Sequence, residues 1–122
     1  MMELLHSPVR ALPVKNWCQP FGIEADVLRL DELHPIVSGN KWFKLQPWLE
    51  RAKAEGKRGL ITFGGAWSNH LLATAEACRV AGLEAIGIVR GERPAQPSAM
   101  LLDAQSRGMQ LHFVSRSDYR DQ

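Results

Sequence analysis

Apolar residues change spacing repeatedly after residue 25, and the changes predict short strands separated by helices. Residues 26–30 (DVLRL) alternate between polar and apolar, which is typical of a half-covered strand. Residues 59–63 are a short apolar run of the type found in buried parallel strands, and residues 84–89 and 110–115 are two further short runs that we expect to form strands. The pattern therefore predicts four strands.

The segments between these strands carry apolar residues at helical spacing. The first predicted helix begins at Lys41 and ends at Gly56, because glycine commonly stops a helix. Two further helices, within 68–82 and 98–108, each follow a polar capping residue and end at a glycine. Ser117 is predicted to cap another helix near residue 122.

The order β-α-β-α-β-α-β predicts an α/β fold with a parallel β-sheet and right-handed crossovers. Residues 1–25 contain three prolines and no clear period, and we expect them to form a lead-in segment. Residues 26–122 are expected to form one α/β domain, since about 100–200 residues is the usual domain size.

The composition of this chain of 122 residues limits the classes of partner that it is expected to bind. Fifteen basic residues against 13 acidic ones give a net charge of +2, too small to favour nucleic acid. No apolar run approaches the roughly 18 residues of a membrane span, and the first residues make a poor signal peptide. Cys18 and Cys78 are isolated, so we expect reduced thiols in a cytoplasmic protein, with Cys78 packed in a helix. The four histidines lack metal-ligand spacing, and we expect no metal.

Lys41 is the first candidate for chemistry, in the string SGNKWFKL (38–45). The positive end of the helix dipole disfavours a cation at a helix start, which favours the neutral amine that condenses with carbonyls. The alternative is an ordinary solvated lysine in a first helical turn. Lys44, one turn later, competes for the same role on spacing alone.

The second candidate is the string TFGGAWSNH (62–70), in which a Gly64-Gly65 turn leads into Ser68, Asn69 and His70. Free N–H groups at a helix start can bind a carboxylate or phosphate, and the Ser and Asn side chains add directed hydrogen bonds. The alternative is a simple helix cap. The string matches neither a P-loop, nor GxGxxG, nor the GxSxG of hydrolases.

Taken together, SGNKxxKL (38–45), FGGxxSNH (63–70) and ATAEACRVAGL (73–83) resemble the 1-aminocyclopropane-1-carboxylate deaminase and D-cysteine desulfhydrase family. The resemblance extends from about Leu28 to the end of the chain. It implies the tryptophan-synthase-β-like fold of pyridoxal-phosphate enzymes, known as fold type II, with pyridoxal 5'-phosphate as the cofactor.

The resemblance also implies roles for the motif residues. Lys41 would be the Schiff-base lysine and, once released, a general acid or base. Asn69 would hydrogen-bond the cofactor ring hydroxyl. Ser68, with the backbone N–H groups of Asn69 and His70, would hold the substrate carboxylate, and Ser68 would take part in proton transfer. The expected reaction converts a small amino acid, of the 1-aminocyclopropane-1-carboxylate or D-cysteine class, to a 2-oxo acid and ammonia.

The chain departs from the family pattern in two ways. Trp67 stands where the family usually has glutamine, and its indole would reshape the pocket. The family's chains are also about twice as long or more, so we expect a C-terminally truncated N-terminal portion with little or no catalytic activity. The alternative function is a non-catalytic α/β module that acts by self-association, as a homodimer, or with a partner chain.

Overall fold

A computed structural model describes residues 9–11 and 19–121 of the chain. The elements alternate between strands and helices over most of this range. In chain order they are β1 (Val9–Ala11), a 3-10 helix (Gln19–Phe21), β2 (Asp26–Leu28), a 3-10 helix (Leu30–Glu32), α1 (Lys41–Ala54), β3 (Gly59–Gly64), α2 (Asn69–Ala81), β4 (Glu84–Arg90), α3 (Ala99–Ser106), β5 (Met109–Val114) and α4 (Arg116–Arg120).

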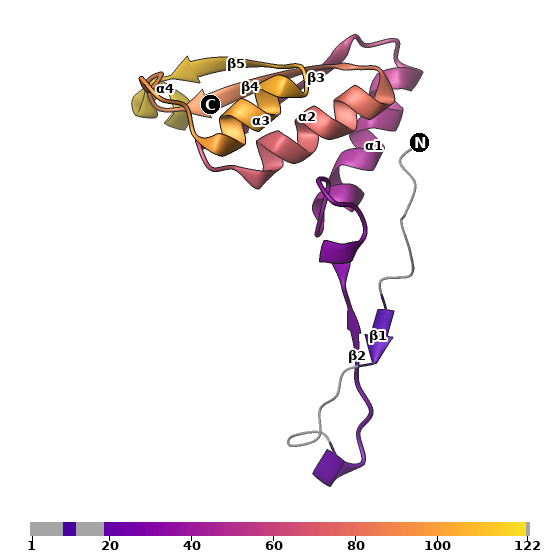
Figure 1. Ribbon diagram of the computed structural model, residues 1–122. Helices are drawn as coiled ribbons and strands as arrows, with labels where there is room; N and C mark the ends of the chain where they lie inside the picture. Colours follow the sequence, from indigo (N-terminus) through magenta and orange to yellow (C-terminus); the bar gives the residue numbers. More distant parts are fainter. Residues whose placement is uncertain (1–8, 12–18, 122) are drawn as a thin grey trace.

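The main sheet consists of three parallel strands in the order β3-β4-β5. Ile61 pairs with Ile86, and Ile88 pairs with His112, so the strands share one continuous register. The helices α2 and α3 connect successive strands and lie on one face of the sheet (Figure 1). The prediction of a parallel α/β unit is therefore confirmed for residues 59–114.

The first predicted strand does not join this sheet, so the prediction of four parallel strands is wrong. β2 pairs antiparallel with β1, with Val9 opposite Leu28 and Ala11 opposite Asp26. Both strands lie in an arm that extends away from the sheet (Figure 1). Alternation of polar and apolar residues is typical of antiparallel strands that expose one face to solvent, whereas buried parallel strands are continuous apolar runs. The alternating DVLRL pattern fits this antiparallel pair, and its assignment to the parallel sheet was wrong.

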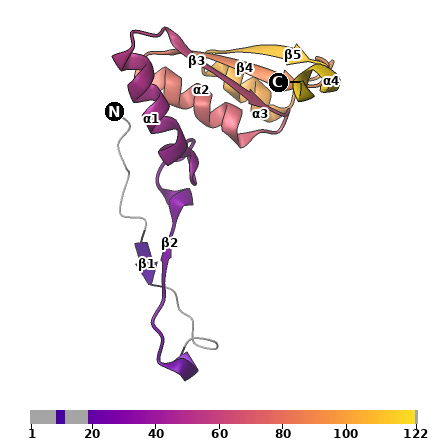
Figure 2. The same ribbon diagram turned by 180° about the vertical axis from the view of Figure 1, so that it is seen from behind.

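Helix α2 lies at the centre of the packing, between the sheet, α1 and α3 (Figures 1 and 2). Small side chains let these neighbours approach, and Ala73, Ala75 and Ala77 are fully buried. Cys78 on the same helix is also buried, as predicted, and burial raises the pKa of its thiol to about 11. Cys18 lies outside the described residues.

The helix caps lie at the residues that the sequence predicts, with one exception. Ser98 caps α3 by accepting the Leu101 N–H at 3.2 Å, and α2 ends at Gly82, whose φ of 70° is left-handed. The last helix begins earlier than predicted, because Ser115, rather than Ser117, accepts the Asp118 N–H at 3.2 Å. Within the described residues, no helix has both the length and the apolar character needed to cross a bilayer.

The face of the sheet opposite α2 and α3 carries apolar side chains that the described residues leave largely uncovered. Ile61 and Phe63 on β3 are 65% and 44% exposed, and their register partners Ile86 and Ile88 on β4 are partly exposed. We call these four residues the open face. Tyr119 of α4 contacts Phe63 at the carboxyl end of this face, with ring centroids 6.0 Å apart.

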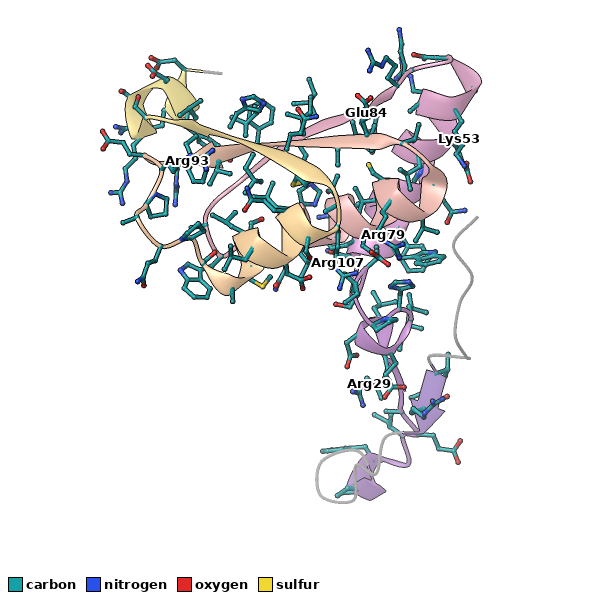
Figure 3. The ribbon with its side chains drawn as sticks, turned by 45° about the horizontal axis from the view of Figure 1, so that its top comes forward. Arg29, Lys53, Arg79, Glu84, Arg93 and Arg107 are labelled. Carbon is teal, nitrogen blue, oxygen red and sulfur yellow. The ribbon has the colours of Figure 1, made fainter. Side chains whose placement is uncertain are left out.

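One buried carboxylate joins α2 to the end of α3. Glu76 accepts hydrogen bonds from Arg79, at 2.8 and 2.9 Å, and from Arg107 at 2.8 Å. Arg107 also pairs with Asp103 at 3.0 Å, and Figure 3 labels the two arginines near the helices they join. These hydrogen bonds with Arg79, ahead of those with Arg107, lower the pKa of Glu76 to about 2.

The depressed pKa of Glu76 predicts a defined pH dependence of stability. The ionised carboxylate stabilises the native chain above the unfolded-state pKa of 4.5, and this contribution is lost as pH falls from 4.5 toward 2. We expect Glu76→Gln to lower the free energy of unfolding by about 2 kcal/mol at pH 7. Urea unfolding at pH 7, 4 and 3 should show this difference shrinking with pH. Glu55→Gln, which removes an exposed pair with Arg51, is the control and should change stability by less than about 0.5 kcal/mol. A difference of constant size at all three pH values would contradict this origin.

Candidate active site

The loop that leads to Lys41 is organised by His34. Its Nδ1 accepts the N–H groups of Ile36 and Val37 at 3.1 and 3.0 Å, and its ring lies 5.8 Å from that of Trp42. Leu33 and Val37 are fully buried on either side. The loop before α1 is therefore fixed by both hydrogen bonds and apolar packing.

Lys41 is the first residue of α1, as predicted, and is half-buried. Its Nζ donates to Oδ1 of Asn40 at 3.0 Å, which is a contact with a neutral amide. None of the ion pairs found within the described residues includes Lys41. Within the described residues, the amine is thus held near the helix start without a carboxylate partner.

The second motif begins α2 through a close contact with β3. Ser68 caps the helix by accepting the Leu71 N–H at 3.3 Å. The Gly64-Gly65 turn does not use a left-handed backbone, because neither glycine has a positive φ. Gly64 is needed for close approach instead, since a Cβ there would lie 2.7 Å from the Ser68 Oγ and 2.8 Å from the Leu71 Cγ.

The two motifs meet at one cavity of about 360 Å³, which we call the Lys41 cavity. The loop contributes Ser38, Gly39, Asn40 and Lys41, and Asn69 comes from the start of α2. The remaining walls are apolar and include side chains from α2 and α3, namely Leu72 and Met100. The structure therefore brings together Lys41 and Asn69, which are far apart in the sequence.

His70 lies in a different place from Asn69. Its Nε2 is 2.8 Å from the Thr62 Oγ1, and it lines a second cavity of about 550 Å³ with Lys44 and Trp48. Burial lowers the pKa of His70, and the positive charges of Lys41 and Lys44 lower it further. Ser68 is not among the residues that line the Lys41 cavity. The three consecutive polar residues thus point to three environments.

The tryptophans also differ from one another. Trp42 is buried, whereas Trp48 is exposed and lines the second cavity. Trp67, which we expected beside a ligand, is 73% exposed and is not among the residues that line the Lys41 cavity. Trp17 lies outside the described residues.

Three residues that shape these cavities were not predicted from the sequence. His34 was considered only as a metal ligand, yet it orients the loop before Lys41. Thr62 holds His70, and Met100 closes the Lys41 cavity from α3. Strand alternation predicts which face of β3 carries Thr62. No local sequence feature predicts the position of Met100. In the part of the chain that the structure describes, no three His, Cys, Asp or Glu side chains gather as a metal site.

Comparison with known proteins places this arrangement in a class of fold. A crystal structure of an ACC deaminase homologue superimposes with a TM-score of 0.67 and 30% sequence identity. The match covers 93% of this chain and 33% of the solved one. The chain thus shares the α/β unit, with its parallel sheet and alternating helices, of an ACC deaminase homologue. No family model matches the sequence.

Two relatives point to the same family. A candidate D-cysteine desulfhydrase 2 of Oryza sativa subsp. japonica is 36% identical over 94 residues, which is 77% of this chain and 23% of the relative. The bifunctional D-cysteine desulfhydrase/1-aminocyclopropane-1-carboxylate deaminase of Arabidopsis thaliana is 30% identical over 126 residues, 96% of this chain and 30% of the relative. Homologues in the 1-aminocyclopropane-1-carboxylate deaminase and D-cysteine desulfhydrase family therefore cover most of this chain, which spans less than a third of the length of these two relatives.

The contact at Gly64 predicts a sharp difference between two neighbouring glycines. Gly64→Ala should push both Ser68 and Leu71 away from residue 64 and lower the free energy of unfolding by about 2 kcal/mol. Gly65→Ala is the matched control, because a Cβ added there would meet no atom within 4 Å and the φ of Gly65 is not positive. Urea unfolding of both variants measures the difference. Equal stabilities would show that the start of α2 does not depend on this contact.

Proposed function

We propose that this chain supplies the cofactor-lysine part of a pyridoxal-phosphate-dependent deaminase or lyase in the cytoplasm. The observation that carries the proposal is the shared cavity of Lys41 and Asn69. The family resemblance names the same two residues for the cofactor, and it was drawn from motifs that are separate in sequence. The substrate is a small amino acid of the 1-aminocyclopropane-1-carboxylate or D-cysteine class, and the products are a 2-oxo acid and ammonia.

The residues present fit an aldehyde cofactor in three respects. The Lys41 cavity, about 360 Å³, lies within the range usual for small-molecule sites. The Lys41 amine contacts only a neutral amide among its described hydrogen-bond partners, so no ion pair must break before it reacts. Asn69 adds an amide with both donor and acceptor groups. Pyridoxal phosphate, when bound, supplies an aldehyde and an electron-withdrawing ring.

Each motif residue has a separate task in this proposal. Lys41 holds the cofactor through its Nζ and carries a proton at that atom when free. Asn69 orients the ring by a hydrogen bond. Ser68 fixes the start of α2 through the Leu71 N–H, which leaves its own hydroxyl hydrogen to bind a substrate carboxylate. His70 contributes its backbone N–H to that carboxylate, while its ring is held by Thr62.

Borohydride trapping tests the lysine assignment. The chain is mixed with pyridoxal phosphate and reduced, and the labelled peptide is identified by mass spectrometry. We expect one adduct, on Lys41, that is lost in Lys41→Ala. Lys44→Ala is the matched control, because Lys44 lies one turn away and lines the other cavity, and it should keep the adduct. Label scattered over several lysines, or centred on Lys44, would contradict the assignment of Lys41 as the cofactor lysine.

The open face favours a second candidate function, a non-catalytic module that forms a homodimer. Ile61, Phe63, Ile86 and Ile88 place adjacent apolar side chains on one side of the sheet. Contiguous exposed apolar patches mark interaction surfaces. A second copy that brings its own open face would bury both patches with twofold symmetry.

Sedimentation equilibrium tests the homodimer. Removing apolar area from the open face by Ile61→Thr, which keeps a β-branched residue in the strand, should raise the dimer dissociation constant by about tenfold. Val80→Thr makes a similar change at an exposed position on α2 and should have no effect. A wild-type chain that stays monomeric at about 100 μM, well above typical homodimer affinities, would exclude this candidate.

A further inference from the structure

The arginines fall into two groups by their partners. Six of the ten in the chain form ion pairs with carboxylates, and they are Arg10, Arg29, Arg51, Arg58, Arg79 and Arg107. The other four, Arg90, Arg93, Arg116 and Arg120, appear in no ion pair among the described residues. These four also gather in one region of the fold, at the end of the sheet where α4 lies, and Figure 3 labels Arg93 there.

This region is hollowed by a cavity of about 660 Å³, which we call the arginine cavity. Arg90, Arg116 and Arg120 line it, together with Gly91 and Phe113. Arg93 lies over the Phe113 ring, with its guanidinium carbon 4.7 Å from the ring centroid. The arginine cavity and the Lys41 cavity share no lining residue.

Contacts with a ring and a carbonyl hold two of the lining guanidinium groups in place. Arg90 lies 6.0 Å from the Tyr119 ring centroid, and that ring in turn contacts Phe63. Arg120 donates to the backbone carbonyl of Arg116 at 3.3 Å. Such contacts position the arginines without pairing them with any carboxylate of the described residues, and this favours an anionic ligand.

Arginines outnumber acidic residues among the described residues that line the cavity. Glu92 is the one carboxylate among the lining residues, against three arginines. Asp118 follows the lining residue Ser117, and its carboxylate accepts a hydrogen bond from the Ser115 hydroxyl at 2.7 Å. The cavity also lies beyond the carboxyl ends of β4 and β5, where open parallel sheets bind ligands.

We propose that the arginine cavity binds the phosphate group of a small molecule. Arginine forks match phosphate oxygens with paired hydrogen bonds, and a phosphate carries enough charge to bridge several guanidinium groups. A cavity at the end of one small sheet favours a small ligand over an extended polyanion, in keeping with a net charge of only +2.

Titration of the ¹⁵N-labelled chain with inorganic pyrophosphate tests the proposal directly in the wild-type protein. We expect saturable NMR shifts confined to residues 90–93 and 113–120. A parallel titration with glycerol 3-phosphate distinguishes a phosphate ester from an inorganic phosphate as the ligand. Neither compound has an aldehyde, so the result is independent of pyridoxal phosphate at Lys41.

A pair of double variants separates a site from general attraction between charges. Arg116→Gln/Arg120→Gln should raise the pyrophosphate dissociation constant at least about tenfold. Arg51→Gln/Arg58→Gln removes the same charge from exposed arginines elsewhere and should change the constant less than about twofold. Equal weakening in both variants, shifts spread over the whole basic surface, or no saturation at about 10 mM would each overturn the proposal.

Discussion

The close contact between the end of β3 and the start of α2 sets the geometry of the candidate active site. Gly64 has no side chain, so Ser68 and Leu71 lie against its backbone. Ser68 is thereby committed to capping the helix. Successive helical residues point about 100° apart, so once Ser68 is fixed, Asn69 and His70 must diverge. Asn69 then reaches the Lys41 cavity, and His70 reaches Thr62 on the strand.

Helix α2 can hold this position because it is packed on several sides. Its alanines allow close approach of α1, α3 and the sheet, and they leave little space for adjustment. Glu76 is buried on the same helix, and Arg79 and Arg107 compensate its charge. Arg107 follows α3, so the same interaction fixes α3, which carries Met100 at the wall of the Lys41 cavity. An ion pair two turns further along α2 therefore supports the site at the start of the helix.

Local sequence signals predicted the elements from Lys41 to Val114, because each was marked by a cap, a glycine stop or an apolar run. Ser98 and Gly82 lie where these rules place them. The strand at 26–28 was also predicted, but its assignment to the parallel sheet was wrong, because its partner, β1, lies in a segment without a clear period. Lys41 and Asn69 were identified from sequence and share a cavity, whereas the roles of His34, Met100 and Arg116 depend on contacts between distant segments. Sequence spacing cannot show such contacts, nor which of the ten arginines form no ion pair within the described part of the chain.

The open face and the Lys41 cavity use different parts of the same unit, so the two candidate functions do not compete for one surface. The open face lies opposite α2 and α3, whereas the cavity is walled by the 35–41 loop and by the starts of those helices. Burying an isoleucine or phenylalanine side chain stabilises an assembly by about 1.5–3 kcal/mol, so a layer of polypeptide over Ile61 and Phe63 would add substantial stability. Such a layer would leave Lys41 and Asn69 accessible, because no residue of the open face lines their cavity. The proposed aldehyde chemistry of Lys41 and the proposed association of the sheet therefore depend on separate surfaces, and each proposal can be tested without the other.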